Sequence, residues 1–309
     1  MELCEVRIMQ IGIVGLGKMG GNMARRLTRG GVEVHGFDPG AAAALASEGV
    51  VAAAESLAKL VAALAAPRVV WMMVPAGDAT EATFGTLCAT LSRGDVIVDG
   101  GNANYKDSQR RAQVAAARGI EFIDCGVSGG IWGLDEGYAL MFGGSAAAAA
   151  RLAPLAKVLA PAPDRGWMHC GPAGSGHFVK MIHNGIEYGM MQAFAEGFAL
   201  MRNKSELSID VAKVAETWRH GSVVRSWLLD LTAQFLAKDA TLAGIAPLVA
   251  DSGEGRWTVN EAVEQGVPAP VLTLALMNRF ESQGKGDYTA KLLAMMRHGF
   301  GGHAVTKQS

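Results

Sequence analysis

The chain has 309 residues, of which 50% are hydrophobic and 18% are charged, and its formal net charge is −1. A chain of this length and composition can bury the core of one large domain or of two ordinary ones. The balanced charge and the lack of any Lys/Arg run argue against nucleic acid or a membrane surface as the main partner and favour a small molecule.

The cysteines and histidines show no metal-binding or redox spacing. The 4 cysteines contain no C-x-x-C pair, and the 7 histidines form no recognisable ligand cluster. We therefore expect reduced thiols and no metal. No apolar run has the length of a membrane span, and the start "MELCEVRIM" lacks the features of a leader, so we expect a cytoplasmic location. Because the first strand pattern begins at Met9, we expect residues 1–8 to be a non-native or disordered extension.

Short β-rich runs alternate with Ala-rich helical stretches from residue 9 to about 171. The runs are MQIGIVG, EVHGFD, RVVWMMVP, DVIVDGG, EFIDCGV, ALMFGG and GWMHC. Such alternation predicts a parallel sheet wrapped by helices. We therefore predict an α/β fold whose N-terminal domain, residues 1–173, is a Rossmann-type, doubly wound, mostly parallel sheet.

The first run leads into a glycine-rich turn, "IGIVGLGKMGG". Gly15, Gly17 and Gly20 have G-x-G-x-x-G spacing between a strand pattern and a helix pattern. In that setting the first glycine makes the tight turn, the second lets the backbone approach a pyrophosphate, and the third allows close helix packing. The helix N-terminus adds a partial positive charge. The turn predicts a dinucleotide site, and a glycine turn without a ligand is the alternative.

Asp38 ends the second run, close to the position about 20 residues downstream where an acidic side chain binds the ribose. Its carboxylate can accept both ribose hydroxyls and would repel a 2′-phosphate, which favours NAD over NADP. Arg25 and Arg26 on the first helix leave NADP open as an alternative. The expected cofactor-binding residues are Gly15, Leu16, Gly17, Lys18, Met19, Gly20, Asp38, Val74, Pro75, Ala76 and Asn102.

Three loops, "VPAG", "DGGN" and "GVSGG", each follow a different predicted strand at its carboxyl end. Open α/β sheets bind ligands at that edge. Backbone N–H groups of Ser128, Gly129 and Gly130 can bind a carboxylate, and Asn102 can hold a hydroxyl or the nicotinamide ribose. Each loop alone is as consistent with a plain turn. Together, beside the glycine turn, they predict a substrate site.

After Gly174 the pattern is helical. Helices are predicted at 175–203, 208–219, 223–237, 257–265 and 268–297. We therefore predict an all-helical C-terminal domain at residues 174–309 that serves substrate binding and dimerisation.

The first of these helices, "FVKMIHNGIEYGMMQ", carries four polar groups. On a helical wheel, Asn184 and Glu187 fall within roughly 40° and 20° of Lys180, and His183 lies about 60° to one side. Apolar residues fill the rest of the circumference, as in a buried helix, so the polar face is expected to line a cleft. The alternative is a structural Lys–Glu pair bridged by the amide.

These motifs resemble those of the decarboxylating 6-phosphogluconate dehydrogenase family in its short, NAD-using form. "DGGNANYKDSQRR", "GVSGG" and above all "FVKMIHNGIEYGMMQ" carry the likeness. Other β-hydroxyacid dehydrogenases share the S-G-G turn and the G-x-G-x-x-x-K-x-x-x-N helix. The stretch "HNGIEY", with Glu187 and Tyr188, separates the 6-phosphogluconate enzymes from them.

The resemblance implies oxidative decarboxylation of 6-phosphogluconate, a sugar acid phosphate, to ribulose 5-phosphate with reduction of NAD. It implies that Lys180 is general base and acid and that Glu187 is the second acid. It also implies a homodimer or homotetramer in which the tail from Arg297 to His303 completes a neighbouring site. The implied substrate-binding residues are Asn102, Ser128, Gly129, Gly130, His183, Asn184, Tyr188, Arg279, Arg297 and His303.

One stretch departs from the family pattern. Ser252 and Glu254 stand where the long members carry a lysine and a threonine at phosphate-binding positions. Because Glu254 would repel a phosphate, either Arg256, Arg279 and Arg297 take over the contact or the loop points elsewhere.

Two other functions remain as alternatives. The first is a simpler 3-hydroxy acid dehydrogenase, which would use Lys180 without Glu187 and without decarboxylation. The second is a non-catalytic NAD-binding regulator, which would keep the glycine turn but would need no proton-transfer pair.

Overall fold

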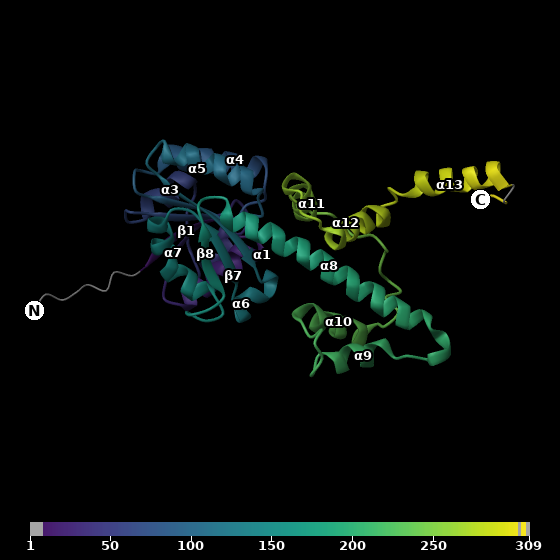
Figure 1. The fold of residues 1–309 in the computed structure, drawn as a ribbon. Coiled ribbons are helices and arrows are strands. Elements are labelled where there is room, and N and C mark those ends of the chain that lie inside the picture. Colours follow the sequence, from purple (N-terminus) through teal and green to yellow (C-terminus); the bar gives the residue numbers. More distant parts are fainter. Residues whose placement is uncertain (1–8, 302–303, 307–309) are drawn as a thin grey trace, which may run out of the picture. The chain divides into compact units, whose positions relative to one another are not determined.

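The computed structural model describes residues 9–301 and 304–306 (Figure 1). The chain divides into two compact units, Met1–Met181 and Ile182–Ser309, and the division falls inside the long helix α8 (Ser175–Asn203). The predicted domain limits of 1–173 and 174–309 stay predictions. The expectation for residues 1–8 concerns a segment outside the described residues.

The first unit is built on an eight-stranded sheet with the order β3-β2-β1-β4-β5-β6-β7-β8. Neighbouring strands are parallel, except that β6 and β7 are antiparallel. The predicted mostly parallel, doubly wound sheet is therefore confirmed. The strands are β1 (Gln10–Val14), β2 (Glu33–Phe37), β3 (Ala52–Ala53), β4 (Val69–Met72), β5 (Val96–Asp99), β6 (Glu121–Ser128), β7 (Ala139–Gly143) and β8 (Trp167–Gly171).

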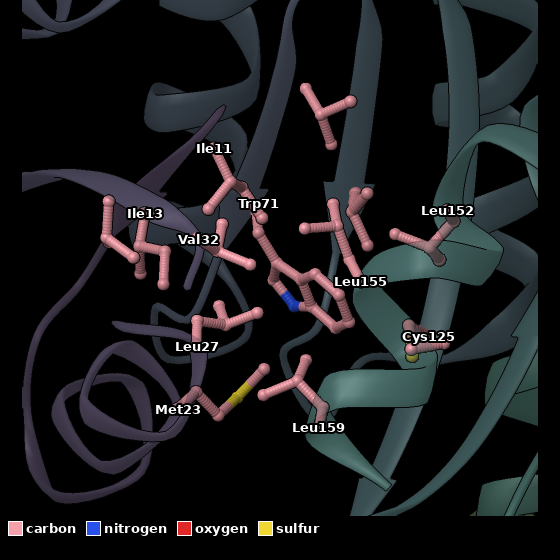
Figure 2. Close-up of a cluster of buried hydrophobic side chains, with 14 of the residues drawn as sticks. Ile11, Ile13, Met23, Leu27, Val32, Trp71, Cys125, Leu152, Leu155 and Leu159 are labelled. Carbon is pink, nitrogen blue, oxygen red and sulfur yellow. The ribbon is translucent and has the colours of Figure 1, made fainter. Parts of the chain in front are cut away.

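Helices cover both faces of this sheet, because alternate residues of each strand enter different cores. In β4, Trp71 packs with α1 and α7, whereas Val70 and Met72 pack with α3, α4 and α5. Figure 2 shows the indole of Trp71 in the middle of the first of these cores. The helices are α1 (Lys18–Arg29), α2 (Ala42–Ser47), α3 (Leu57–Ala63), α4 (Asp78–Thr90), α5 (Tyr105–Ala116), α6 (Gly133–Glu136) and α7 (Ala146–Leu159).

The second unit is helical, as predicted, and its described residues, 182–301 and 304–306, contain no strand. Besides the rest of α8, its helices are α9 (Val211–Trp218), α10 (Trp227–Lys238), α11 (Glu254–Gln265), α12 (Pro270–Ser282) and α13 (Asp287–Gly301). No helix of the described chain is both long and apolar enough to cross a bilayer.

The prediction of one helix over 268–297 is wrong. α12 ends at Ser282 and α13 starts at Asp287. Gly284 in the connection has φ of 75°, a left-handed conformation that ends a helix and that glycine adopts at no steric cost. α13 then runs on to Gly301, so Arg297 lies within a helix rather than in a free tail.

Candidate active site

The three glycines of the turn after β1 have different surroundings. Gly15 has φ of 88°, and a Cβ there would lie 2.5 Å from the Met73 carbonyl oxygen. A Cβ at Gly20 would lie 2.0 Å from the Gly15 carbonyl oxygen. The fold therefore demands both. A Cβ at Gly17 would meet nothing within 4 Å, and its φ of −61° suits any residue. Packing therefore does not explain why residue 17 is a glycine.

Asp38 at the end of β2 is tied to this turn. Its Oδ2 accepts a hydrogen bond from Leu16 N at 2.8 Å, and its Oδ1 accepts from Gly40 N at 2.8 Å and Ala41 N at 2.9 Å. Burial acts to raise the pKa of this carboxyl, but the three backbone donors outweigh it and hold the pKa below its ordinary value. The turn therefore has a fixed negative charge beside it.

The two arginines of α1 that left NADP open have partners within the protein. Arg25 places Nε and Nη2 on the two carboxylate oxygens of Glu48, each at 2.9 Å. Arg26 donates to four main-chain carbonyl oxygens, those of Leu134, Asp135, Val158 and Ala160. Both guanidinium groups are therefore engaged in holding α1 to its neighbours.

The loop that carries Asn102 follows β5, and ion pairs of buried residues hold the start of the loop in place. Asp99, the last residue of that strand, is fully buried and accepts from Arg111 Nη1 at 2.9 Å. Arg111, also buried, reaches Glu81 of α4 at 2.7 Å through Nη2. Asn102 itself is exposed at the end of the loop. The second cofactor loop, from Val74 to Ala76, follows β4 at the same edge of the sheet and is half-buried to exposed.

Ser128 is the last residue of β6, the strand that pairs with β5. Gly129 and Gly130 have φ of 139° and 53°, which explains why both are glycines, and the chain then enters a short 3-10 turn. Because β5 and β6 are parallel neighbours, the Asn102 loop and the S-G-G turn leave the sheet at one edge.

Lys180 belongs to the same edge. It is 8% exposed and packs on β6, where a Cβ at Gly126 would lie 2.3 Å from Lys180 Cβ. The structure thus groups Lys180 with the S-G-G turn inside the first unit. Glu187 follows seven residues later on α8 and belongs to the second unit.

Within the second unit, α8 presents a polar trio. His183 Nδ1 lies 3.1 Å from Asn184 Oδ1 and 3.8 Å from Glu187 Oε2. Asn184 is buried, whereas the side chains of His183 and Glu187 are 41% and 39% exposed. Glu187 therefore has the access that a proton donor needs, together with an imidazole beside it.

The predicted phosphate end is built around Tyr188, also on α8. The Arg279 guanidinium stacks 3.3 Å from the centre of the Tyr188 ring, and its Nη1 donates to Ala250 O at 2.8 Å. The Tyr188 hydroxyl lies 3.2 Å from Ser252 Oγ, which donates to Glu254 Oε2 at 2.5 Å. Glu254 is only 3% exposed.

These contacts bear on the two alternatives for phosphate binding, namely that arginines replace the missing contacts or that the loop with Glu254 points elsewhere. Glu254 is turned into the protein, so its charge does not face solvent. Arg256 forms an ion pair with Asp251, whereas Arg279 stacks on Tyr188. Arg297 is exposed on α13, and His303 lies outside the described residues.

Sequence reasoning missed two buried carboxylates that support these loops, Asp99 and Asp124. Each stands in an apolar strand run, "VIVD" and "FIDCG", where a charge needs a partner. The partners do not adjoin these runs: Arg111, 12 residues further on, binds Asp99, and the N–H groups of Gly174 and His177, 50 and 53 residues further on, bind Asp124.

Comparison with known proteins gives consistent matches over nearly the whole chain. The model for the NAD binding domain of 6-phosphogluconate dehydrogenase matches residues 10–170, and the model for the C-terminal domain of 6-phosphogluconate dehydrogenase matches residues 176–307. The NAD(+)-dependent, decarboxylating 6-phosphogluconate dehydrogenase of Haloferax volcanii is 42% identical over 302 residues, which cover 97% of this chain and 99% of the relative.

Among solved structures, the 6-phosphogluconate dehydrogenase of Plasmodium falciparum, studied with NADP+ and with 6-phosphogluconate, is similar with a TM-score of 0.82 at 29% identity. The match covers 97% of this chain and 66% of that one. The 3-hydroxyisobutyrate dehydrogenase of Salmonella typhimurium has a TM-score of 0.73 at 24% identity over 90% of this chain and 95% of that one. A likeness at that identity shows a shared fold alone.

Proposed function

The chain belongs to the 6-phosphogluconate dehydrogenase family, and from this premise we propose that it oxidises and decarboxylates 6-phosphogluconate to ribulose 5-phosphate. One observation carries the proposal beyond membership. A single helix, α8, holds Lys180 buried against the sheet edge and, seven residues later, the half-exposed Glu187 beside His183. The reaction needs two proton-transfer groups for two successive steps, and this helix carries two candidates for them.

We propose NAD rather than NADP as the preferred cofactor. Gly17 leaves room for a pyrophosphate at the start of α1, and Asp38 keeps a negative charge where the ribose would lie. Arg25 and Arg26 are engaged elsewhere and offer no free cation for a 2′-phosphate. When bound, the nicotinamide supplies the acceptor for the hydride that leaves the alcohol carbon.

Lys180 would take the hydroxyl proton in the first step. Lys180 is 8% exposed and lies against β6, close to the S-G-G turn. Asn102 and the N–H groups of the S-G-G turn, which lie at the same sheet edge, would hold the sugar acid in place.

The ketone formed in this way lies next to the carbon that carries the carboxylate. Lys180, now protonated, would donate to the ketone oxygen while the carbon–carbon bond to the carboxylate breaks and carbon dioxide leaves. The resulting enediol then needs a proton on carbon, which Glu187 would give, while Lys180 takes back the enol proton. Each such group contributes about a hundred- to ten-thousand-fold in rate.

We also propose a homodimer or homotetramer in which the C-terminal segment completes a neighbour's site. α13 leaves much apolar surface uncovered, as the exposure of Tyr288, Leu292, Leu293 and Met296 shows. Surfaces of this kind usually mark interfaces. Arg297 lies on the same helix and would bring a cation to the partner's substrate.

A steady-state assay of 6-phosphogluconate and gluconate, each with NAD and with NADP, tests the activity. We expect carbon dioxide and reduced cofactor in equal amounts from 6-phosphogluconate with NAD. Reduction without carbon dioxide would identify a simpler hydroxy acid dehydrogenase, and nucleotide binding without turnover would identify a regulator.

Lys180→Met should abolish hydride transfer while NAD affinity stays nearly unchanged.

A further inference from the structure

The first turn of α8 is held by a carboxylate from the sheet. Asp124 of β6 is fully buried, and its two oxygens accept hydrogen bonds from Gly174 N at 2.6 Å and His177 N at 2.8 Å. These are backbone donors at the helix start, which have no partner within the helix. Burial raises the pKa of this carboxyl, while His177 and the two N–H groups act in the opposite direction.

The same strand touches α8 again one turn later. A Cβ at Gly126 would lie 2.3 Å from Cβ and 2.9 Å from Cγ of Lys180. Within the first turn, a Cβ at Gly176 would lie 2.5 Å from both the Asp124 and the Met141 carbonyl oxygens. The helix start therefore packs directly on the backbones of β6 and β7 at Gly176, and the stem of Lys180 packs directly on Gly126.

A third contact fixes the rotation of the helix. His177 is buried, and its Nδ1 lies 2.7 Å from Ser108 Oγ of α5. The Tyr105 and Phe178 rings meet edge to face with centroids 5.2 Å apart, which adds a second link between the same two helices. Because α5 follows the Asn102 loop in the chain, these two contacts also link the start of α8 to that loop.

We propose that Asp124 is a positioning residue for Lys180, a role that rests on the proposed function of Lys180 as base. Asp124, Gly126 and Ser128 are every second residue of β6, so they lie on the same face of the strand. Asp124 anchors the helix start, Gly126 contacts Lys180, and Ser128 begins the S-G-G turn. One strand thus sets the distance between the base and the group expected to hold the substrate carboxylate.

The test compares Asp124→Asn with the wild type. The amide keeps the size of the carboxylate but presents an N–H group to one of the two backbone donors, so the helix start must shift. Displacements of about 1 Å cost on the order of a hundredfold in rate. We expect kcat to fall about ten- to a hundredfold, with KM and NAD affinity within about threefold of the wild type.

A loss of stability alone would not reproduce this pattern. With substrate deuterated at the carbon that loses hydride, the isotope effect on kcat/KM should rise in Asp124→Asn, because the misplaced base makes the chemical step slower relative to binding. A smaller folded fraction would leave the isotope effect of the remaining enzyme unchanged.

Asp95 offers a matched control. It is also buried, and it also accepts two backbone hydrogen bonds, from Arg68 N at 2.7 Å and Ser92 N at 2.9 Å, but it lies before β5 at the other edge of the sheet. Asp95→Asn should lower stability and leave kcat and the isotope effect as in the wild type. If both Asn variants behave alike, the positioning role is wrong.

Gly126→Ala tests the same geometry without touching the carboxylate and stands in if Asp124→Asn does not fold. The added methyl must displace Lys180, so kcat should fall and the isotope effect should rise. If Lys180→Met is inactive while Gly126→Ala and Asp124→Asn turn over normally, the base role of Lys180 stands and the positioning role is refuted. If Lys180→Met is itself active, the proposed function fails first.

Discussion

At the scale of single residues, the two carboxylates proposed to serve cofactor choice and catalysis have different surroundings. Asp38 accepts three backbone hydrogen bonds beside the glycine turn, and Glu187 lies half exposed beside His183. A fixed acceptor with a lowered pKa keeps its charge, whereas an accessible carboxyl can exchange its proton. The first setting suits recognition of a ribose, and the second suits a general acid.

Asp38 should set the choice of cofactor. We expect kcat/KM with NAD to exceed that with NADP by at least about tenfold, or roughly 1.4 kcal/mol. Asp38→Asn removes the charge that repels a 2′-phosphate, so this ratio should fall towards one. The amide also loses the bond to Leu16 N, so KM should rise for both cofactors. Equal values for the two cofactors in the wild type would refute the assignment.

The contribution of Asp38 to NAD binding should persist in mild acid. The folded pKa of Asp38 is lowered, so the carboxylate's contribution is complete above its ordinary pKa and is lost only as the pH falls through the folded value. Because the 2′-phosphate of NADP itself gains a proton at about pH 6, the measurement uses NAD alone. The ratio of kcat/KM for NAD between the wild type and Asp38→Asn, measured from pH 8 down to about pH 5, should therefore stay constant. A ratio that declines across that range would mean that the advantage of the wild type depends on another group.

Glu187→Gln should impair the late protonation step most. The amide keeps size and hydrogen bonding but carries no acidic proton, so exchange of solvent deuterium into C1 of ribulose 5-phosphate should slow by about a hundredfold or more. Glu196 on the same helix, which pairs with Gln192 at 2.7 Å, provides the control, and Glu196→Gln should exchange normally. Exchange at the wild-type rate in Glu187→Gln would assign the acid to another group.

At the scale of elements, the sequence patterns predict the strands and helices that form from neighbouring residues. The seven apolar runs became strands, and the 3.6-residue period found the helices. β3 was missed because it consists of two exposed alanines that are recruited by pairing with β2. The prediction of one helix over 268–297 joins α12 and α13 because helical patterns lie on both sides of the break, but the connection at 283–286 is polar, and Gly284 within it is left-handed.

The same limit applies to the candidate site. Lys180, Asn184 and Glu187 were predicted because one helix carries them at readable spacing. The partners of Asp124 and Asp99 were not, since each carboxylate is satisfied by groups brought to it by the fold, Gly174 N for the first and Arg111 for the second. A single sequence shows that a buried charge needs a partner, but it does not show which one.

Two neighbouring arginines on α5 test how much such a partner contributes. Arg110 and Arg111 both bind Glu81, but the Arg111 side chain is 1% exposed and also holds Asp99, whereas that of Arg110 is 51% exposed. Arg111→Met leaves the buried Asp99 carboxylate without its cation and should lower the free energy of unfolding by about 3–5 kcal/mol. Arg110→Met should cost about 0–1 kcal/mol.

Hydrogen exchange at the amides of β4 and β5 measures this difference locally, without requiring the whole chain to unfold in one step. We expect the protection of these amides to drop far more in Arg111→Met than in Arg110→Met. Similar losses in the two variants would show that the Asp99 pair is not what holds the Asn102 loop.

At the scale of the whole molecule, the two units differ in how completely they cover their apolar residues. The sheet of the first unit has a large buried core on each face, whereas the second unit has small buried clusters around Tyr188 and Leu229. Large apolar side chains remain exposed along α12 and α13, among them Val271, Leu274 and Met295. In the proposed homodimer, a second copy of the chain related by two-fold symmetry would cover them.

The proposed shared site makes the last prediction. Lys180→Met should be inactive because it lacks the base, and a double variant, Arg297→Ala with His303→Ala, should lose the contacts that the C-terminal segment gives to its neighbour. A forked, charge-assisted contact such as Arg297 can make with a phosphate is worth about 1.5–3 kcal/mol of binding. The two variants are then mixed under conditions that let subunits exchange.

In a mixed dimer, one site receives both lesions and the other receives neither, because the intact lysine and the intact C-terminal segment meet there. Activity of up to about half the wild-type value per mixed dimer should therefore return. Mixing Lys180→Met with itself, under the same conditions, should restore nothing. If exchange is verified by mass and activity does not return, the C-terminal segment serves its own subunit, and the apolar face of α13 must be covered for a reason other than catalysis.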